Sequence, residues 1–151
     1  MNQNKFIQAS KKERQLMKKL FQQNNVTSFI FTPEDGMDRE EGYYTATTTS
    51  TPYIFEVKNR NISTTTYKTI AIEESKVKYL LEQAKERNEQ AIIFFFFNDG
   101  YWMCQPLYQD VYYHTTNFWM PVTTMGWNNE KVLKPCVEFL IEPSKLKRYE
   151  A

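Results

Sequence analysis

Two segments of the chain carry apolar residues at helical spacing. The first, over about residues 10–23, opens with a sequence of capping-box form that runs from Ser10 to Glu13. The second, over about residues 72–87, has apolar residues at positions i, i+3, i+4 and i+7. The apolar residues are Leu16, Met17, Leu20 and Phe21 in the first segment and Val77, Leu80, Leu81 and Ala84 in the second. We therefore predict two amphipathic helices, each with one side buried.

Five other segments are rich in β-branched and aromatic residues, which favour strands. Asn98-Asp99-Gly100 predicts the turn of a hairpin, and residues 50–52 predict another turn. One of the strand segments is continuously apolar, as expected for a strand that is covered on both faces. The five predicted strands are residues 26–32, 43–49, 53–58, the continuously apolar 91–97, and 101–105.

The order helix, three strands, helix, two strands predicts an α/β domain with a mixed sheet flanked by helices. A chain of 151 residues is large enough for one core and shows no repeat or linker, so we expect a single domain. Residues 59–67 are polar and rich in threonine, which indicates an irregular connection. Residues 132–141 predict a late edge strand, interrupted by Pro135. Between them, aromatic residues are expected to cover one end of the sheet, namely Tyr108, Tyr112, Tyr113, Phe118 and Trp119.

Charge is unevenly distributed along the chain, although the net charge of +1 excludes an overall basic binding protein. Residues 1–25 contain six cations and one anion, whereas residues 34–41 contain five acids and one arginine. A positive segment near a carboxylate cluster suits a polyanionic substrate that is held over metal ions. A solvated helix face and an acidic loop would give the same pattern, so charge alone does not separate the two interpretations.

The two cysteines and the single histidine give no candidate for a reactive centre. Cys104 and Cys136 lack the spacing of metal ligands and are expected to be reduced, packed thiols. His114 is the only histidine and is expected to be structural, while the aromatic rings near it are expected in the core or at a subunit interface. No secretory signal or membrane-spanning run is visible, which predicts a cytoplasmic protein that does not contact a membrane.

The strand predicted over residues 53–58 contains a Glu-x-Lys tripeptide. Alternation along a strand places Glu56 and Lys58 on one face and Phe55 and Val57 on the other. A carboxylate can bind Mg²⁺ there, and a second carboxylate is expected from the acidic segment. The lysine is suited to hold a metal-activated water or to stabilise negative charge at a phosphate. The alternative is a structural ion pair on a solvated sheet face.

The tripeptide alone is weak evidence, since roughly one copy is expected by chance in a chain of this length. A second copy, Glu74-Ser75-Lys76, lies in the predicted second helix. Residues two apart on a helix point to nearly opposite sides, so that copy cannot form a joint site. The assignment of Glu56 and Lys58 to a metal site must therefore rest on the sequence around them.

The order of these features resembles the PD-(D/E)XK nuclease superfamily, which has the restriction-endonuclease-like fold. In that superfamily a helix precedes a strand hairpin, an acid lies at the start of the second strand, and Glu-x-Lys or Asp-x-Lys lies on the third. A helix and a strand follow. The resemblance covers about residues 10–106, which would form the nuclease core, with residues 107–151 packed on it as an extension. It implies a mixed central sheet flanked by helices.

The resemblance also implies roles for individual residues. Asp38 would be the first metal-binding acid, Glu56 the second, and Lys58 the catalytic lysine. A methionine precedes Asp38 where the family has proline, and 17 residues separate it from Glu56. Asp35 and Glu41 therefore remain alternatives for the first acid.

Glu13 has two interpretations. Many members of the superfamily place a metal-associated glutamate on the first helix, and Glu13 shares the stripe of apolar residues there. The capping box accounts for Glu13 without any chemistry. The sequence does not decide between these two interpretations of Glu13.

The function implied by the resemblance is metal-dependent hydrolysis of DNA phosphodiester bonds with Mg²⁺, or with Mn²⁺, by a homodimer. Branched DNA and phage or host DNA are the expected substrates. The alternative is a non-cleaving module of the same fold that binds nucleic acid or protein. Lys76 is either such a contact or a solvated helical lysine. The expected nucleic-acid contacts are Lys11, Lys12, Arg14, Arg60 and Lys76.

Overall fold

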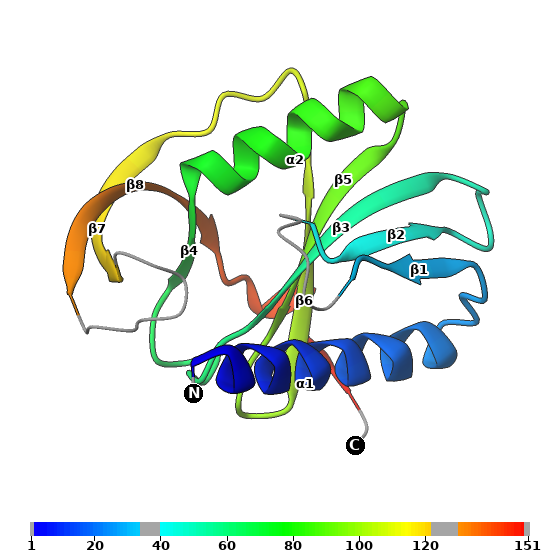
Figure 1. Ribbon diagram of the computed structural model, residues 1–151, viewed down its shortest axis with the longest axis horizontal. Helices are drawn as coiled ribbons and strands as arrows, with labels where there is room; N and C mark the ends of the chain where they lie inside the picture. Colours follow the sequence, from blue (N-terminus) through cyan, green and yellow to red (C-terminus); the bar gives the residue numbers. More distant parts are fainter. Residues whose placement is uncertain (1, 34–39, 122–129, 150–151) are drawn as a thin grey trace.

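The computed structural model describes residues 2–33, 40–121 and 130–149. These residues form two α-helices, nine strands and one short 3-10 helix (Figure 1). In chain order the elements are α1 (Asn2–Gln23), β1 (Phe29–Phe31), β2 (Gly42–Thr45), β3 (Pro52–Asn59), β4 (Thr69–Glu73), α2 (Glu74–Arg87), β5 (Gln90–Phe96), β6 (Tyr101–Leu107), β7 (Thr115–Pro121), β8 (Lys131–Leu140), η1 (Pro143–Lys145) and β9 (Lys147–Arg148).

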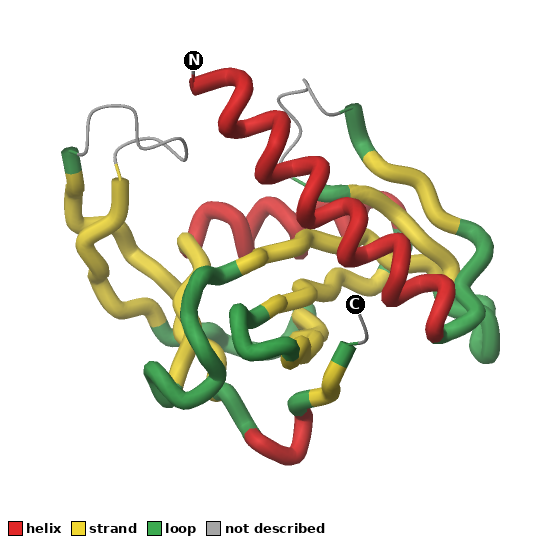
Figure 2. Tube along the Cα trace, turned by 90° about the horizontal axis from the view of Figure 1, so that it is seen from below, coloured by secondary structure: helices red, strands yellow, loops and turns green. Residues whose placement is uncertain are grey.

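The strands form two sheets. The larger has the order β1-β2-β3-β5-β6-β9, and the smaller has the order β4-β8-β7. In the larger sheet β3 and β5 run parallel, while its other neighbouring strands run antiparallel. Helices α1 and α2 lie on opposite sides of this sheet, and the view from below shows α1 crossing it (Figures 1 and 2). The predicted mixed sheet flanked by helices is confirmed.

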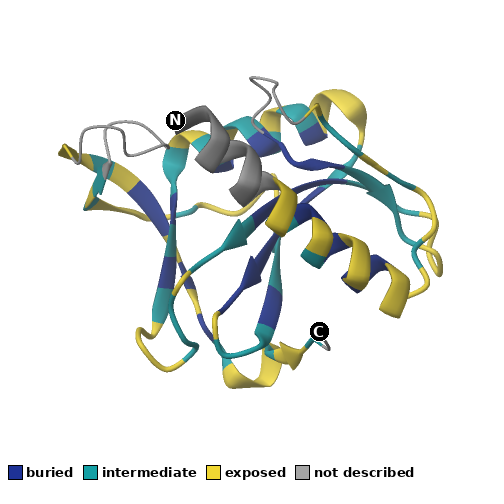
Figure 3. Ribbon diagram, turned by 60° about the horizontal axis from the view of Figure 1, so that its bottom comes forward, coloured by how far each residue is buried: buried dark blue, intermediate teal, exposed yellow. Residues whose placement is uncertain are grey.

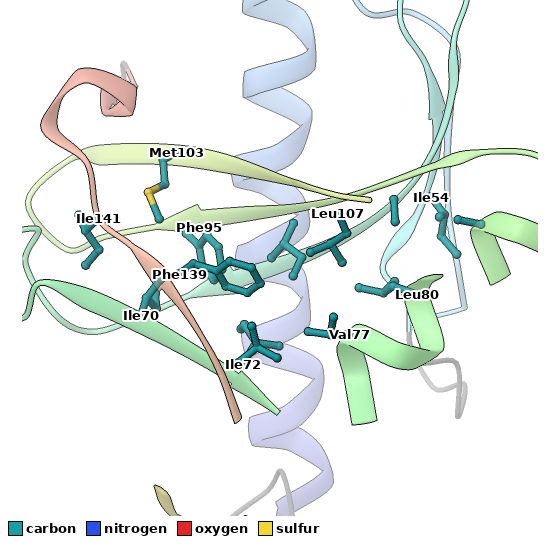
Figure 4. Packing of buried hydrophobic residues seen from close by; sticks show 14 of the residues in the cluster. Ile54, Ile70, Ile72, Val77, Leu80, Phe95, Met103, Leu107, Phe139 and Ile141 are labelled. Atoms are coloured by element: carbon teal, nitrogen blue, oxygen red, sulfur yellow. The ribbon is translucent and has the colours of Figure 1, made fainter. Parts of the chain in front are cut away.

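Alternating side chains of β3 enter two separate apolar cores. Ile54 is fully buried in the core beneath α2, which also receives side chains of the smaller sheet (Figure 4). Phe55 and Val57 are fully buried in the core beneath α1. Strand β5 also contributes to both cores, so the middle of the sheet is buried on both faces (Figure 3). This confirms that residues 91–97 form a strand covered on both sides.

The structure corrects several predicted boundaries. Helix α1 begins at Asn2 rather than near residue 10, so the Ser10 sequence does not cap it. Helix α2 begins at Glu74 because Thr69–Glu73 forms strand β4, paired with β8. Strand β8 pairs with β4 on one side and β7 on the other, so it is not the predicted edge strand. Pairing between segments about 65 residues apart leaves no local pattern that could have shown this.

The aromatic residues after Leu107 do not all cover the sheet as predicted. Tyr112 is 80% exposed and Trp119 is 65% exposed, and Tyr108 is also exposed. Tyr113 does pack against the core, with its ring centroid 6.0 Å from that of Phe139. Trp119 lies on β7, and β7 and β8 extend beyond the two helices (Figure 1), whereas Tyr108 and Tyr112 lie in the connection before β7.

Two further expectations concern chemistry and location. Cys136 is buried, Cys104 is half-buried, and both are free thiols whose pKa is raised by burial. Among the described residues, no helix is long and apolar enough to cross a membrane.

Candidate functional site

Glu56 lies on the central strand β3 and is only 5% exposed. Its Oε1 accepts a hydrogen bond of 2.9 Å from the backbone N–H of Val57, and its Oε2 lies 2.6 Å from Nζ of Lys76. Lys76 comes from the first turns of α2 and Lys58 from β3 itself, where it is half-buried. Glu56 is thus a buried carboxylate paired with a lysine of α2, unlike the ion pair on a solvated sheet face that the alternative interpretation expects.

Glu41 enters the same region from the residue before β2. Its backbone N–H donates to the carbonyl of Phe55 over 2.9 Å, although Gly42 is the residue that pairs with Phe55. Glu41 and Gly42 thus both lie opposite Phe55, as in a β-bulge, and such bulges redirect side chains. A Cβ on Gly42 would lie 2.2 Å from the carbonyl oxygen of Ile30, so only glycine fits. The bulge therefore depends on this glycine.

The bulge sends neighbouring acids to opposite sides of the sheet. Glu40 accepts a hydrogen bond of 3.0 Å from the hydroxyl of Tyr79 on α2. Glu41 pairs with Arg14 on α1, with 3.1 Å between Oε1 and Nε. Both acids are buried. The charge of Glu56 raises the pKa of Glu41, and the charge of Lys58 lowers it.

Glu13 lies in the interior of α1 and joins this cluster. Its pKa is raised to about 8, mainly by burial and also by the charges of Glu41 and Glu56, while Lys58 acts in the opposite direction. A hydrogen bond from the backbone of Asn59 also favours the charged form. Since α1 begins well before Ser10, the capping interpretation of Glu13 is wrong, and its position beside the other acids needs another explanation.

The electrostatics of the cluster favour an added cation. Burial raises the pKa of Glu41 above its ordinary value, and the neighbouring charge of Glu56 raises it further. Arg14 and Lys58 oppose this shift without removing it. Carboxylates that raise one another's pKa gain most from a divalent ion between them.

The residues also fit a divalent ion by donor type. Mg²⁺ usually takes one or two carboxylates and completes its shell with water and phosphate oxygens. Glu56 and Glu41 could supply these two ligands, with Glu13 beside them. Over residues 2–33, 40–121 and 130–149, no group of three or more acidic, histidine or cysteine side chains is arranged so that it could hold a metal ion. Asp38 and Asp35 lie outside the described residues.

The basic candidates fall into two groups. Lys11 and Lys12 are exposed on α1, as a contact with a phosphate backbone requires. Arg14, Arg60 and Lys76 instead lie inside the structure. Arg14 and Lys76 bind the two acids, and Nη2 of Arg60 donates to the carbonyl of Ala71 over 3.1 Å.

Arg60 connects the acid cluster to the smaller sheet. It directly follows β3, and Ala71, whose carbonyl accepts its hydrogen bond, belongs to β4 of the smaller sheet. Burial lowers its pKa, and the nearby charges of Glu13 and Glu56 act against that. This placement favours a structural and electrostatic role over direct contact with nucleic acid.

The sequence did not single out two exposed cations. Lys18 and Lys19 line a surface depression on α1 together with Lys12. They belong to the basic run of residues 1–25, so helical spacing from Lys11 and Lys12 could have identified them. They extend the positively charged face of α1 toward its C-terminal end.

Replacing Glu13 with glutamine should stabilise the metal-free protein at high pH. A carboxyl whose pKa is raised from 4.5 in the unfolded chain to about 8 in the folded protein contributes stability that is fully present below pH 4.5, and this stability is lost progressively as the pH rises to about 8. Thermal unfolding in EDTA should therefore give equal Tm values at pH 4 and a Tm for the variant that exceeds that of wild type by several degrees at pH 9. A variant that is less stable than wild type at pH 9 would contradict this assignment.

Comparison with known proteins gives little at the sequence level. No protein-family model matches the chain, and no curated protein matches it. Among solved structures it is similar to Hjc, a Holliday junction resolvase from the archaeal hyperthermophile Archaeoglobus fulgidus. The two share 18% identity over 63% of this chain and 74% of the resolvase chain, with a TM-score of 0.47.

Proposed function

We propose that this protein is a metal-dependent endonuclease that hydrolyses phosphodiester bonds in DNA. The observation that supports this most is that the charges of Glu56 and Lys58, on β3, act on the pKa of both Glu13 and Glu41, which come from two other segments that are distant in sequence. A lone Glu-x-Lys could arise by chance, whereas three mutually destabilising carboxylates beside a lysine are costly unless they have a function.

Each residue of the cluster has a role in this proposal. Glu56 and Glu41 hold the ion, and Glu13 lies beside them. When bound, the ion lowers the pKa of a coordinated water and neutralises charge on the scissile phosphate. Lys58, on the Glu56 side of β3, orients the attacking water or stabilises the negative charge that develops. The buried setting strengthens each of these interactions.

Substrate binding is assigned to the exposed lysines of α1. Lys11, Lys12, Lys18 and Lys19 give this helix a positive surface along its length. Such contacts with phosphates are independent of sequence and weaken with added salt. Branched DNA remains the substrate class of the proposal, with Mg²⁺ or Mn²⁺ as the ion. A homodimer would supply one site for each strand.

The first metal-binding acid can be assigned by two matched substitutions. Asp38 held this role in the sequence-based prediction, and Glu41 is an acid of the same segment whose pKa is raised by the charge of Glu56. If Glu41 is the ligand, Glu41→Gln should lower cleavage by about 10²-fold or more, whereas Asp38→Asn should retain nearly full activity. Initial rates of plasmid nicking measure both. The opposite ranking would return the role to Asp38.

A non-cleaving module of the same fold is the second candidate. The ion pairs of Glu41 with Arg14 and of Glu56 with Lys76 favour it, because they already neutralise both acids without metal. Incubation with supercoiled, linear and four-way-junction DNA, each with Mg²⁺, Mn²⁺ or EDTA, separates the two functions. Metal-dependent cleavage supports the nuclease, and binding without cleavage of all three substrates supports the module.

A further inference from the structure

The Glu56 carboxylate is fully engaged by the protein itself. Its Oε1 accepts from the backbone N–H of Val57, and its Oε2 lies 2.6 Å from Nζ of Lys76. The Glu56 side chain is 6% exposed, so few water molecules can share it. A divalent ion that used Oε2 would compete with the ammonium group for the negative charge of this oxygen.

The other ion pair of the cluster is held more firmly. Arg14 is 11% exposed at its side chain, its Nη2 lies 3.4 Å from Oγ1 of Thr32, and its guanidinium lies 5.2 Å from the ring centroid of Phe31. The side chain of Lys76 is 22% exposed and ends in a compact ammonium on a flexible stem. Of the two cations, Lys76 is therefore the one that can leave its partner at lower cost.

We propose that Lys76 is a built-in counter-ion of Glu56 that competes with the divalent metal. It stabilises the buried carboxylate in the absence of metal, and its ammonium group would have to leave or share Oε2 for Glu56 to hold a divalent ion. This inference rests on the proposed function, because it assumes that Glu56 is a metal ligand. Its consequence is that the chain binds metal more weakly than its carboxylates would allow.

The size of the effect follows from the population of the paired state. If Lys76 occupies Glu56 about 90% of the time, the apparent metal affinity falls about tenfold. Removing the lysine should raise the apparent metal affinity by the same factor. It should also leave a buried carboxylate without its cation in the absence of metal, which lowers stability.

The test compares Lys76→Met with Lys78→Met. Lys78 lies on the same helix, two residues away, and pairs with Glu74 at the surface over 3.1 Å. Calorimetric titration with Mn²⁺ should show about tenfold tighter binding for Lys76→Met and wild-type affinity for Lys78→Met. In EDTA the Tm of Lys76→Met should be lower than that of wild type, and saturating Mn²⁺ should reduce the difference.

A second variant covers the case in which Lys76→Met does not fold. Lys76→Arg keeps the charge and can bind a carboxylate through two nitrogens, so it should bind Mn²⁺ no more tightly than wild type. Tighter Mn²⁺ binding by Lys76→Arg would overturn the proposal. So would a Lys76→Met affinity equal to or weaker than that of wild type.

Glu56→Gln distinguishes this inference from the proposed function. If wild type binds Mn²⁺ and Glu56→Gln does not, Glu56 is a ligand, and an unchanged affinity in Lys76→Met then overturns only the role of Lys76. If Mn²⁺ binds neither wild type nor Lys76→Met, the metal site itself is refuted. If Mn²⁺ binds only after Lys76 is removed, the competition is confirmed in its strongest form.

Discussion

Replacing Glu56 with glutamine is expected to reduce DNA cleavage by about 10³-fold, the largest effect of any single substitution in the chain. Glutamine keeps the shape and the oxygen that accepts from the Val57 N–H, and it removes the negative charge. A hard divalent ion then loses its most buried ligand, while Lys76 loses its partner. Initial rates of cleavage in Mg²⁺ measure the effect.

The control for this substitution is Glu74→Gln. Glu74 belongs to the other Glu-x-Lys sequence of the chain, and its carboxylate pairs with Lys78 at the start of α2. We expect it to retain wild-type cleavage, because a surface ion pair contributes little. Equal activity of the Glu56 and Glu74 variants would remove Glu56 from the site, even if the protein proved to be a nuclease.

Replacing Lys58 with methionine is expected to lower cleavage by about 10²- to 10³-fold while metal binding remains. The ammonium group is assigned to the attacking water or to the developing charge, not to the ion. Its charge favours the ionised forms of Glu13 and Glu41, so the carboxylates lose a competing cation in the variant. The Tm increase caused by Mn²⁺ should therefore persist although cleavage is nearly lost.

Lys68→Met serves as the matched control, since Lys68 is exposed and lies outside the cluster. It should leave both cleavage and the Mn²⁺-induced Tm increase unchanged. If Lys58→Met loses the metal effect together with cleavage, Lys58 supports the fold of the site and the catalytic assignment is wrong.

Local pattern was sufficient to predict the elements that carry the site. The alternation of β3 depends only on adjacent residues, and it correctly separated Glu56 from Phe55 and Val57. The apolar spacing of α2 likewise identified buried Val77 and Leu80. Both features follow from periodicity, which a single sequence contains in full.

Contacts between distant segments could not be predicted in this way. Strand β4 exists because Thr69–Glu73 pairs with β8, and a five-residue segment before a helix resembles the beginning of that helix. The start of α1 at Asn2 was obscured by a local sequence of capping-box form. In both cases a local signal competed with an arrangement that only the whole fold determines.

The choice of first acid illustrates the same limit within the site. Five acids lie between residues 34 and 41, and sequence spacing could not rank them. Gly42 and the offset at Phe55 direct Glu41 to α1 and Glu40 to α2. A bulge alters the side-chain alternation that spacing arguments assume, so spacing alone could not predict the side of the sheet on which each acid lies.

The central claim is that the acids around Glu56 form a metal site that cleaves DNA. A crystal structure of the wild-type protein grown with Mn²⁺ tests it most directly, through anomalous scattering at the manganese edge. We predict one strong anomalous peak within coordination distance of the Glu56 and Glu41 carboxylates, with Lys58 beside it. Absence of a peak at this cluster, in Mn²⁺ that supports DNA cleavage by the same preparation, would contradict the account.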